Sequence, residues 1–250
     1  MRLAKIQFFF NLIGRGADKM LNQFSRTELL IGKEGIEKLQ NSKVAIFGIG
    51  GVGSFVVEGL VRAGVGHLVI VDYDKYDVTN INRQLGAMHS TIGKYKVDVM
   101  KERILDINPN AKVEAYRPNE IDGGETNLLN SSFTYVVDAI DTMTNKLKLI
   151  EKAKAEKINI ITATGAGNKL DPTKFEVKDI YNTSVCPVCK ILRKELSKRN
   201  IKNLKVVYSK ETPKKPNNAS EEKTLGSISF VPSVAGLIIA GEVIKDIINN

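Results

Sequence analysis

A glycine-rich turn in the first quarter of the chain has the composition of a phosphate-binding loop. A strand-like run at residues 44–47 precedes it, a helix-like run follows it, and its sequence is Gly48-Ile49-Gly50-Gly51-Val52-Gly53-Ser54. Glycines allow the backbone to approach a polyphosphate, and the first turn of a helix offers unpaired N–H groups and a positive dipole end. The predicted nucleotide contacts in this turn are Gly48, Gly50, Gly51 and Gly53.

Asp72 stands about twenty residues beyond the turn, at the end of a second strand-like run at 68–71. An acidic residue at this spacing holds ribose hydroxyls in dinucleotide-binding sites. NAD and ATP both contain a ribose and phosphates. The turn and Asp72 alone therefore leave two classes open, a nicotinamide- or flavin-dependent oxidoreductase and an ATP-dependent enzyme.

The polar run that follows Asp72 favours ATP. Asp74, Asn80 and Arg83 fall within it, and Lys96 comes thirteen residues after Arg83. Adenylyl transfer needs such cations, because negative charge builds up on the α-phosphate and on the departing pyrophosphate. Asp141 follows a further strand-like run, at the edge of the sheet where ligands bind, and its carboxylate suits Mg²⁺ on the phosphates.

Alternating strand-like and helix-like runs must position these residues. Strands are expected at 44–47, 68–71, 112–116, 135–138 and 159–162, and helices at 25–39, 54–63, 94–107 and 145–157. This alternation predicts an α/β fold, Rossmann-like and doubly wound around a mostly parallel sheet. The rhythm then changes, and we expect a C-terminal mixed α/β extension with strands at 175–179 and 204–208, helices at 188–199 and 228–248, and a solvated loop at 210–223.

The length of 250 residues allows one large domain. We expect a flexible extension at 1–19 and a single domain at 20–250, with a nucleotide-binding core at about 40–164 and a substrate-facing part at about 165–250. The C-terminal apolar run contains Pro232, Glu242, Lys245 and Asp246, which predicts a packed helix and no membrane span.

Positive charge is concentrated in one segment. Of the net charge of +9, residues 190–223 contribute +7, with 11 lysines and arginines against 4 acidic residues. A basic helix followed by a basic loop is typical of a nucleic-acid-binding surface, although a solvated helix face has the same composition. The predicted RNA contacts are Lys190, Arg193, Lys194, Lys198 and Arg199.

The chain has two cysteines, in the single Cys-x-x-Cys motif Cys186-Pro187-Val188-Cys189. Two thiols make no disulfide framework, and with no signal peptide apparent they fit a reducing cytoplasm. A structural zinc would need His67 or His89 as further ligands, both far away in sequence, so no zinc is expected. Packing or capping of the basic helix is the favoured role of the pair, with redox chemistry or a sulfur relay as the alternative.

Four motifs together resemble the adenylating enzymes of the ThiF/HesA/MoeB family, relatives of ubiquitin-activating enzymes. They are residues 48–54, 72–84, 93–96 and 137–141. The resemblance implies that ATP and magnesium are bound and that a substrate carboxylate attacks the α-phosphate. It implies Asp72 on the ribose, Asn80, Arg83 and Lys96 on the phosphates, and Asp141 on the magnesium. Arg26 matches an arginine that a neighbouring protomer inserts into the site, which implies a homodimer.

Residues 164–173, 192–196, 206–213 and 226–233 are similar to the tRNA threonylcarbamoyladenosine dehydratases within this family. That resemblance implies adenylation of the threonyl carboxylate of a modified adenosine in tRNA, followed by ring closure onto the substrate's own carbamoyl group with net loss of water. Gly165, Asn168 and Lys169 are expected near the ring-closing step.

Three other functions stay open at this point. One is activation of the C-terminus of a ubiquitin-like sulfur carrier of the thiamine or molybdopterin type. Another is an NAD-dependent oxidoreductase. The third is a non-enzymatic tRNA-binding or assembly module with a degenerate site. Some members of the family that this chain resembles carry a reactive cysteine in the loop before the last helix. Residues 212–225 contain no cysteine, so no sulfur-transfer partner is expected.

Overall fold

The computed structural model describes residues 21–118, 124–215 and 225–249. The expected extension at 1–19 and the end of the expected loop at 210–223 lie outside these residues. Within them, seven strands form one sheet in the order β3-β2-β1-β4-β5-β7-β6, and β6 alone runs antiparallel to its neighbour. The strands are β1 (Lys43–Phe47), β2 (His67–Val71), β3 (Lys112–Tyr116), β4 (Tyr135–Asp138), β5 (Asn159–Ala163), β6 (Phe175–Asp179) and β7 (Lys205–Ser209).

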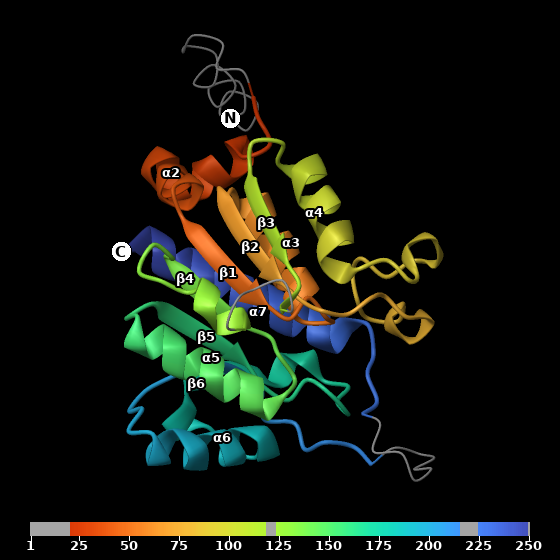
Figure 1. Cartoon of the computed structure of the whole chain (residues 1–250), viewed down its shortest axis with the longest axis vertical. Coiled ribbons are helices and arrows are strands. Elements are labelled where there is room, and N and C mark those ends of the chain that lie inside the picture. Colours follow the sequence, from red (N-terminus) through yellow and green to blue (C-terminus); the bar gives the residue numbers. More distant parts are fainter. Residues whose placement is uncertain (1–20, 119–123, 216–224, 250) are drawn as a thin grey trace, which may run out of the picture.

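Helices cover both faces of the sheet (Figure 1). They are α2 (Ser25–Gln40), α3 (Gly53–Ala63), α4 (Lys96–Ile107), α5 (Met143–Ala155), α6 (Pro187–Lys198) and α7 (Phe230–Asn249). The central strand β1 shows how the sequence builds the two layers, because successive side chains of a strand point to opposite faces. Val44 and Ile46 belong to the core with α3, α4 and α7, whereas Ala45 and Phe47 belong to the core with α5 and α6.

The C-terminal helix α7 packs closely along α3. A Cβ on Gly59 would lie 2.6 Å from the Cβ of Ala240, and one on Gly236 would lie 2.4 Å from the carbonyl oxygen of Val52. Small residues at these crossings let the two backbones approach and exclude a larger side chain. Among the described residues, no helix has the length and apolar character needed to cross a membrane.

The predicted fold class is confirmed, and most element boundaries shift by one or two residues. The expected helix at 94–107 begins only at Lys96, because Tyr95 before it is extended. The expected helix at 25–39 is interrupted at Gly32, whose φ of 71° is left-handed and which a non-glycine residue would adopt only with strain. The C-terminal part adds β6 and β7 to the edge of the same sheet beside β5.

The sheet has a topological switch point between β1 and β4. The chain proceeds outward from β1 through β2 to β3 in one direction, and from β4 to β5 in the other. The loops after β1 and β4 therefore diverge at the carboxyl ends of these strands, which is where open α/β sheets bind ligands. The predicted nucleotide-binding residues belong to this edge.

Candidate nucleotide-binding site

The glycine turn is pressed against the loop that follows β4. Gly48 has a φ of +86°, and a Cβ there would lie 2.6 Å from the carbonyl oxygen of Ala139. A Cβ on Gly53, the first residue of α3, would lie 1.8 Å from the carbonyl oxygen of Gly48. No side chain fits at either position. The turn therefore keeps the N-terminus of α3 open toward the switch point, as a phosphate-binding turn requires.

Asp72 is tied to the glycine turn by its own carboxylate. One oxygen accepts a hydrogen bond from the backbone N–H of Ile49 at 2.6 Å, and the other accepts one from the N–H of Asp74 at 2.8 Å. Burial raises the pKa of Asp72, and the positive charge of Lys96 opposes that rise. Asp72 thus fixes the shape of the turn, a role that its spacing in the sequence did not reveal.

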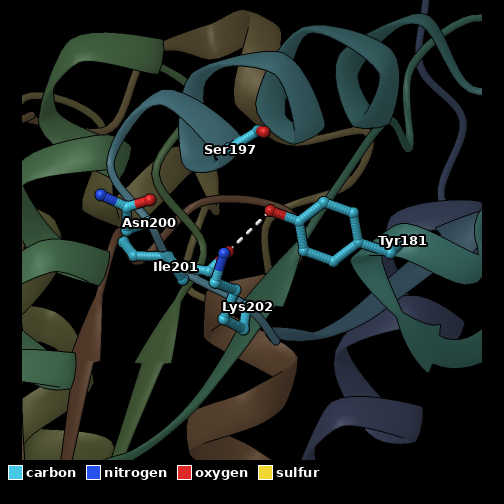
Figure 2. A pocket seen from close by; sticks show the side chains of 5 residues that line it. All are labelled: Tyr181, Ser197, Asn200, Ile201 and Lys202. Atoms are coloured by element: carbon cyan, nitrogen blue, oxygen red, sulfur yellow. Dashed lines mark hydrogen bonds between the residues drawn. The ribbon is translucent and has the colours of Figure 1, made fainter.

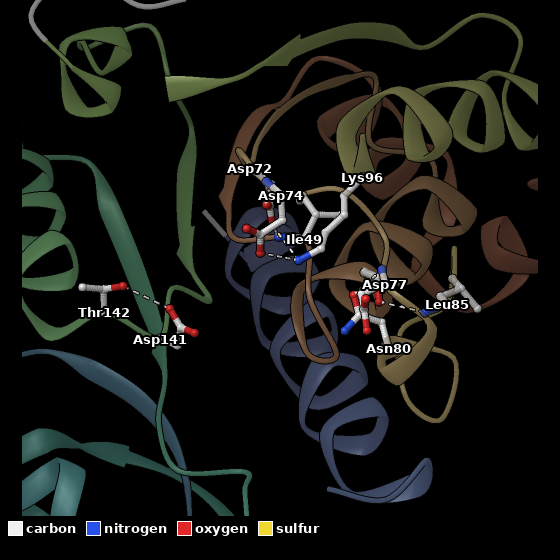
Figure 3. A network of polar contacts seen from close by, with 10 residues as sticks. Ile49, Asp72, Asp74, Asp77, Asn80, Leu85, Lys96, Asp141 and Thr142 are labelled. Carbon is white, nitrogen blue, oxygen red and sulfur yellow. Dashed lines mark hydrogen bonds and ion pairs between the residues drawn. The ribbon is translucent and has the colours of Figure 1, made fainter. Parts of the chain in front are cut away.

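Lys96 is brought beside Asp72 by the start of α4. Its ammonium lies 2.6 Å from Oδ2 of Asp74 and 3.9 Å from Oδ2 of Asp72. The Lys96 side chain is buried, whereas the Asp74 side chain is 47% exposed. Figure 3 shows these three side chains converging next to Ile49 of the glycine turn. The Lys96 ammonium is therefore held at the site by Asp74, whose carboxylate remains accessible to solvent.

Arg83 and Asn80 lie in the turns after β2. The half-buried Arg83 donates from its guanidinium to the carbonyl oxygen of Thr79 and to Oδ1 of Asn82, both at 2.9 Å. A Cβ on Gly51 would lie 3.3 Å from Cγ of Arg83, which places this arginine against the glycine turn. Asn80 accepts a hydrogen bond from the N–H of Asp77 at 3.1 Å and so completes the capping box of the short helix at Val78–Asn80, whose N-cap is Asp77.

Gln84 is a buried polar residue at the site that the sequence motifs did not single out. Its Nε2 would lie 3.9 Å from a Cβ on Gly50, and its Oε1 has no hydrogen-bond partner among the described residues. A buried amide oxygen without a partner is costly unless a ligand or water meets it. In the sequence, the one feature that could have pointed to Gln84 is its position directly after Arg83.

Asp141 stands on the other side of the switch point, in the loop after β4. It is exposed, and one carboxylate oxygen accepts a hydrogen bond from the Thr142 hydroxyl at 3.1 Å (Figure 3). Within the described ranges, no cluster of three or more His, Cys, Asp or Glu side chains could hold a metal ion. Asp141 fits Mg²⁺ in the other common way, where one or two carboxylates share the ion with substrate phosphates and water.

A second lysine–aspartate pair, which sequence reasoning missed, lies beneath that loop. Asp138 at the end of β4 and Lys146 on α5 are joined at 2.8 Å, with side chains 0% and 3% exposed. Burial raises the pKa of Asp138 and the Lys146 charge opposes this. A signal existed, because Lys146 falls on the apolar stripe of α5 with Leu149, Ile150 and Ala153, where a lysine needs a buried partner.

The five predicted RNA contacts do not form one free cationic surface. Arg193 is half-buried and donates to the carbonyl oxygens of Ile180 and Thr183. Lys198 pairs with Glu195, and Arg199 pairs with Glu195 and Glu151. Lys190 and Lys194 are exposed, with no ion pair to the residues that the structure describes. Lys190 lies near the carboxyl edge of the sheet, since α6 begins beside the loop after β5 and ends near the start of β7.

A shallow hollow of about 240 Å³ lies at that far end of α6 (Figure 2). Its lining residues are Tyr181, Ser197, Asn200, Ile201 and Lys202. The Tyr181 hydroxyl donates to the carbonyl oxygen of Ile201 at 2.6 Å across it. Because this hollow is at the amino edge of the sheet, it is remote from the nucleotide-binding residues. Arg26 is also apart from them within this chain, exposed on the first turn of α2.

Comparisons with known proteins agree with this geometry. A model of the ThiF family matches residues 24–250. The tRNA threonylcarbamoyladenosine dehydratase of Bacillus subtilis is 44% identical over 245 residues, covering 92% of this chain and 96% of that protein. The Escherichia coli protein of the same name is 34% identical over 180 residues, covering 72% of this chain and 67% of that protein.

Solved structures of the E. coli dehydratase, TcdA, share the fold. The complex with AMP superposes with a TM-score of 0.82 and the complex with ATP with 0.79. Each is 29% identical and covers 93% of this chain and 96% of that chain. The resemblance expected from the motifs is confirmed, and the chain belongs to the ThiF family.

Proposed function

We propose that this protein is an ATP-dependent dehydratase that converts threonylcarbamoyladenosine in tRNA to its cyclic form. The observation that carries the proposal is the similarity, over nearly the whole chain, to relatives named for this reaction. The ATP and AMP complexes of the E. coli enzyme support ATP as the co-substrate. The glycine turn, Arg83, Lys96 and Asp141 would supply the groups that bind ATP at one edge of this sheet.

In the first step the threonyl carboxylate attacks the α-phosphate and pyrophosphate leaves. Arg83 and Lys96 would stabilise the charge that develops on the phosphates. Lys96 can turn toward them by leaving Asp74, since that carboxylate is solvated and needs no replacement partner. Asp72 would hold the ribose while it fixes the glycine turn. Asp141 would hold Mg²⁺, which when bound neutralises phosphate charge.

In the second step the carbamoyl group of the same substrate attacks the acyl carbon and AMP leaves. The nucleophile and the acyl group belong to one molecule, so proximity alone supplies much of the acceleration and no catalytic cysteine is required. The sum of both steps is removal of one water from the nucleoside, with its oxygen carried away in AMP.

The test is to incubate the protein with ATP, Mg²⁺ and tRNA that carries threonylcarbamoyladenosine, and then to analyse the nucleosides by mass spectrometry. We expect a product lighter by one water, formed only when ATP is present. Unchanged nucleosides, with an active relative as control, would reject the proposal. Pyrophosphate exchange that depends on a sulfur-carrier protein and ignores tRNA would support the rival function, whose named relatives are matched over less than half of their own length.

We propose that tRNA binds at the end of α6 nearest the nucleotide-binding site, where the exposed Lys190 and Lys194 contact its phosphate backbone. Replacing both with alanine should weaken tRNA binding and lower the slope of log K against log salt by about 1 for each lysine that binds a phosphate. Lys198→Ala is the matched control, because Lys198 is paired with Glu195 at the far end of the helix. An equal effect of the control in a salt titration would contradict this assignment.

We also propose a homodimer in which Arg26 completes the partner's site. Arg26 shares the first part of α2 with Leu29 and Leu30, which are 85% and 88% exposed. Large apolar side chains grouped on a helix are typical of an interface. A tRNA substrate is consistent with the cytoplasmic location expected from the sequence. Sedimentation analysis of the native chain and of Leu29→Glu distinguishes a dimer from a monomer.

A further inference from the structure

The Cys-x-x-Cys motif, which the proposed reaction does not use, is folded as a close pair. Cys186 is the residue that caps α6, Pro187 is its first helical residue, and Cys189 lies in its first turn. Both side chains are buried, and the two thiols are hydrogen-bonded to one another. Cys-x-x-Cys motifs and helix N-termini both favour a reactive thiolate.

The pair lies directly beneath the loop that follows β5. A Cβ on Gly165, whose φ is +55°, would lie 2.9 Å from Sγ of Cys186, so only glycine fits over this sulfur. The Thr164 hydroxyl is 3.2 Å from Sγ of Cys189. The Lys169 ammonium, buried under the same loop, places positive charge near both thiols. Thr164, Gly165 and Lys169 all belong to this loop, at the carboxyl edge of the sheet.

The surroundings make the two thiols unequal. The hydrogen bond from Cys189, the backbone N–H groups of Val188 and Cys189, and the Lys169 charge lower the pKa of Cys186 to about 6. The hydrogen bond to Cys186 and burial raise the pKa of Cys189. A thiolate beside a protonated thiol is the arrangement of an attacking and a resolving cysteine.

We propose that Cys186 and Cys189 are a redox-active dithiol, which a hydroperoxide oxidises to an intramolecular disulfide. The Cys186 thiolate attacks the terminal peroxide oxygen, the O–O bond breaks, and Cys186 becomes a sulfenic acid as hydroxide leaves. The Cys189 sulfur then attacks Sγ of Cys186 and water leaves with the Cys189 proton. Two thiols and one hydrogen peroxide give one disulfide and two waters. A small thiol reductant reverses the change.

The experiment uses the full, reduced chain and hydrogen peroxide at neutral pH, followed by alkylation of remaining thiols and mass spectrometry of the tryptic peptide 179–190, which contains both cysteines. We expect this peptide to lose two hydrogen atoms, to escape alkylation, and to regain both thiols after reduction. Sulfinic acid at Cys186 in the native chain, or linkage between chains, without the internal disulfide would overturn the proposal.

Single variants distinguish the two roles. In Cys189→Ser, Cys186 should be trapped by dimedone as a sulfenic acid, since no resolving thiol remains. In Cys186→Ser, Cys189 should react at least about tenfold more slowly than Cys186 does in the other variant. Equal rates would contradict the assignment of Cys186 as the attacking residue.

A measurement on the unchanged sequence guards against variants that do not fold. The rate of disulfide formation in the native chain should rise through pH 6 and level off below pH 8, following the pKa of Cys186. In the urea-unfolded chain the rate should instead keep rising above pH 8, as for ordinary thiols. The same profile for folded and unfolded chains would overturn the proposal.

Discussion

Two lysine–aspartate pairs lie at the same edge of the sheet, on opposite sides of the switch point, and they differ in their access to solvent. Lys96 meets Asp74 at 2.6 Å, and Lys146 meets Asp138 at 2.8 Å. The Asp74 side chain is 47% exposed, whereas that of Asp138 is 0% exposed. The two nitrogen–oxygen distances are similar, so the pairs differ mainly in whether solvent can reach the aspartate.

The Lys146–Asp138 pair, the closed pair, stabilises the backbone around the site. Asp138 also accepts from the N–H of Ile140 at 3.1 Å, and Lys146 also donates to the carbonyl oxygen of Ala163 at 3.1 Å. It therefore joins the ends of β4 and β5 and shapes the loop that carries Asp141. In the Lys96–Asp74 pair, the open pair, the aspartate is accessible to solvent. We therefore propose that Lys96 leaves Asp74 when phosphates bind.

The largest effect should follow Lys146→Met. This change keeps the length of the side chain and leaves the Asp138 carboxylate buried without its cation. The expected cost is about 3–5 kcal/mol in the free energy of unfolding, measured by urea denaturation. A loss below about 1 kcal/mol would mean that the closed pair does not stabilise the backbone around the site.

Lys96→Met should act on catalysis far more than on stability. Loss of one cation from the developing phosphate charge should lower kcat about 10²–10³-fold. The free energy of unfolding should fall by less than in Lys146→Met, because solvated Asp74 tolerates the loss and buried Asp72 keeps two backbone hydrogen bonds. Lys94→Met is the control, since Lys94 is exposed two residues earlier. Equal activity of both variants would remove Lys96 from the site.

Asp141→Asn should have a smaller effect on turnover, about 10-fold to 100-fold, that additional Mg²⁺ partly restores. Asp141 is exposed, so thermal unfolding should not change measurably. The control is Glu102→Gln on the outer surface of α4. A loss of activity that Mg²⁺ titration leaves untouched would separate Asp141 from the metal.

Removing both charges of the closed pair should cost less stability than removing the lysine alone. The double variant Asp138→Asn with Lys146→Met leaves no unpaired charge and keeps an oxygen for the N–H of Ile140. It should be more stable than Lys146→Met alone by at least about 2 kcal/mol. Urea denaturation of the two variants side by side measures this difference. Equal stabilities would show that the cost of the single variant comes from packing.

The sequence predicted the sheet, the glycine turn and the residues around it, because these depend on local periodicity and short motifs. It could not predict partners that are distant along the chain. The hydrogen bonds that Ile49 donates to Asp72 and that Lys96 donates to Asp74 can form only when the strands have assembled. Arg193 was expected to contact RNA, yet its guanidinium donates hydrogen bonds to backbone carbonyls beside α6. Composition does not distinguish an arginine that is free to bind RNA from one that is already hydrogen-bonded within the protein.

The central claim, that ATP activates the carboxylate by adenylation, is tested most directly with oxygen-18. The threonyl carboxylate of the modified tRNA is labelled, the protein and MgATP are added, and the released nucleotides are analysed by mass spectrometry. Attack of the carboxylate on the α-phosphate predicts one labelled oxygen in AMP and unlabelled pyrophosphate. Cyclic product formed with labelled ADP or labelled phosphate, or with unlabelled AMP, would contradict the account.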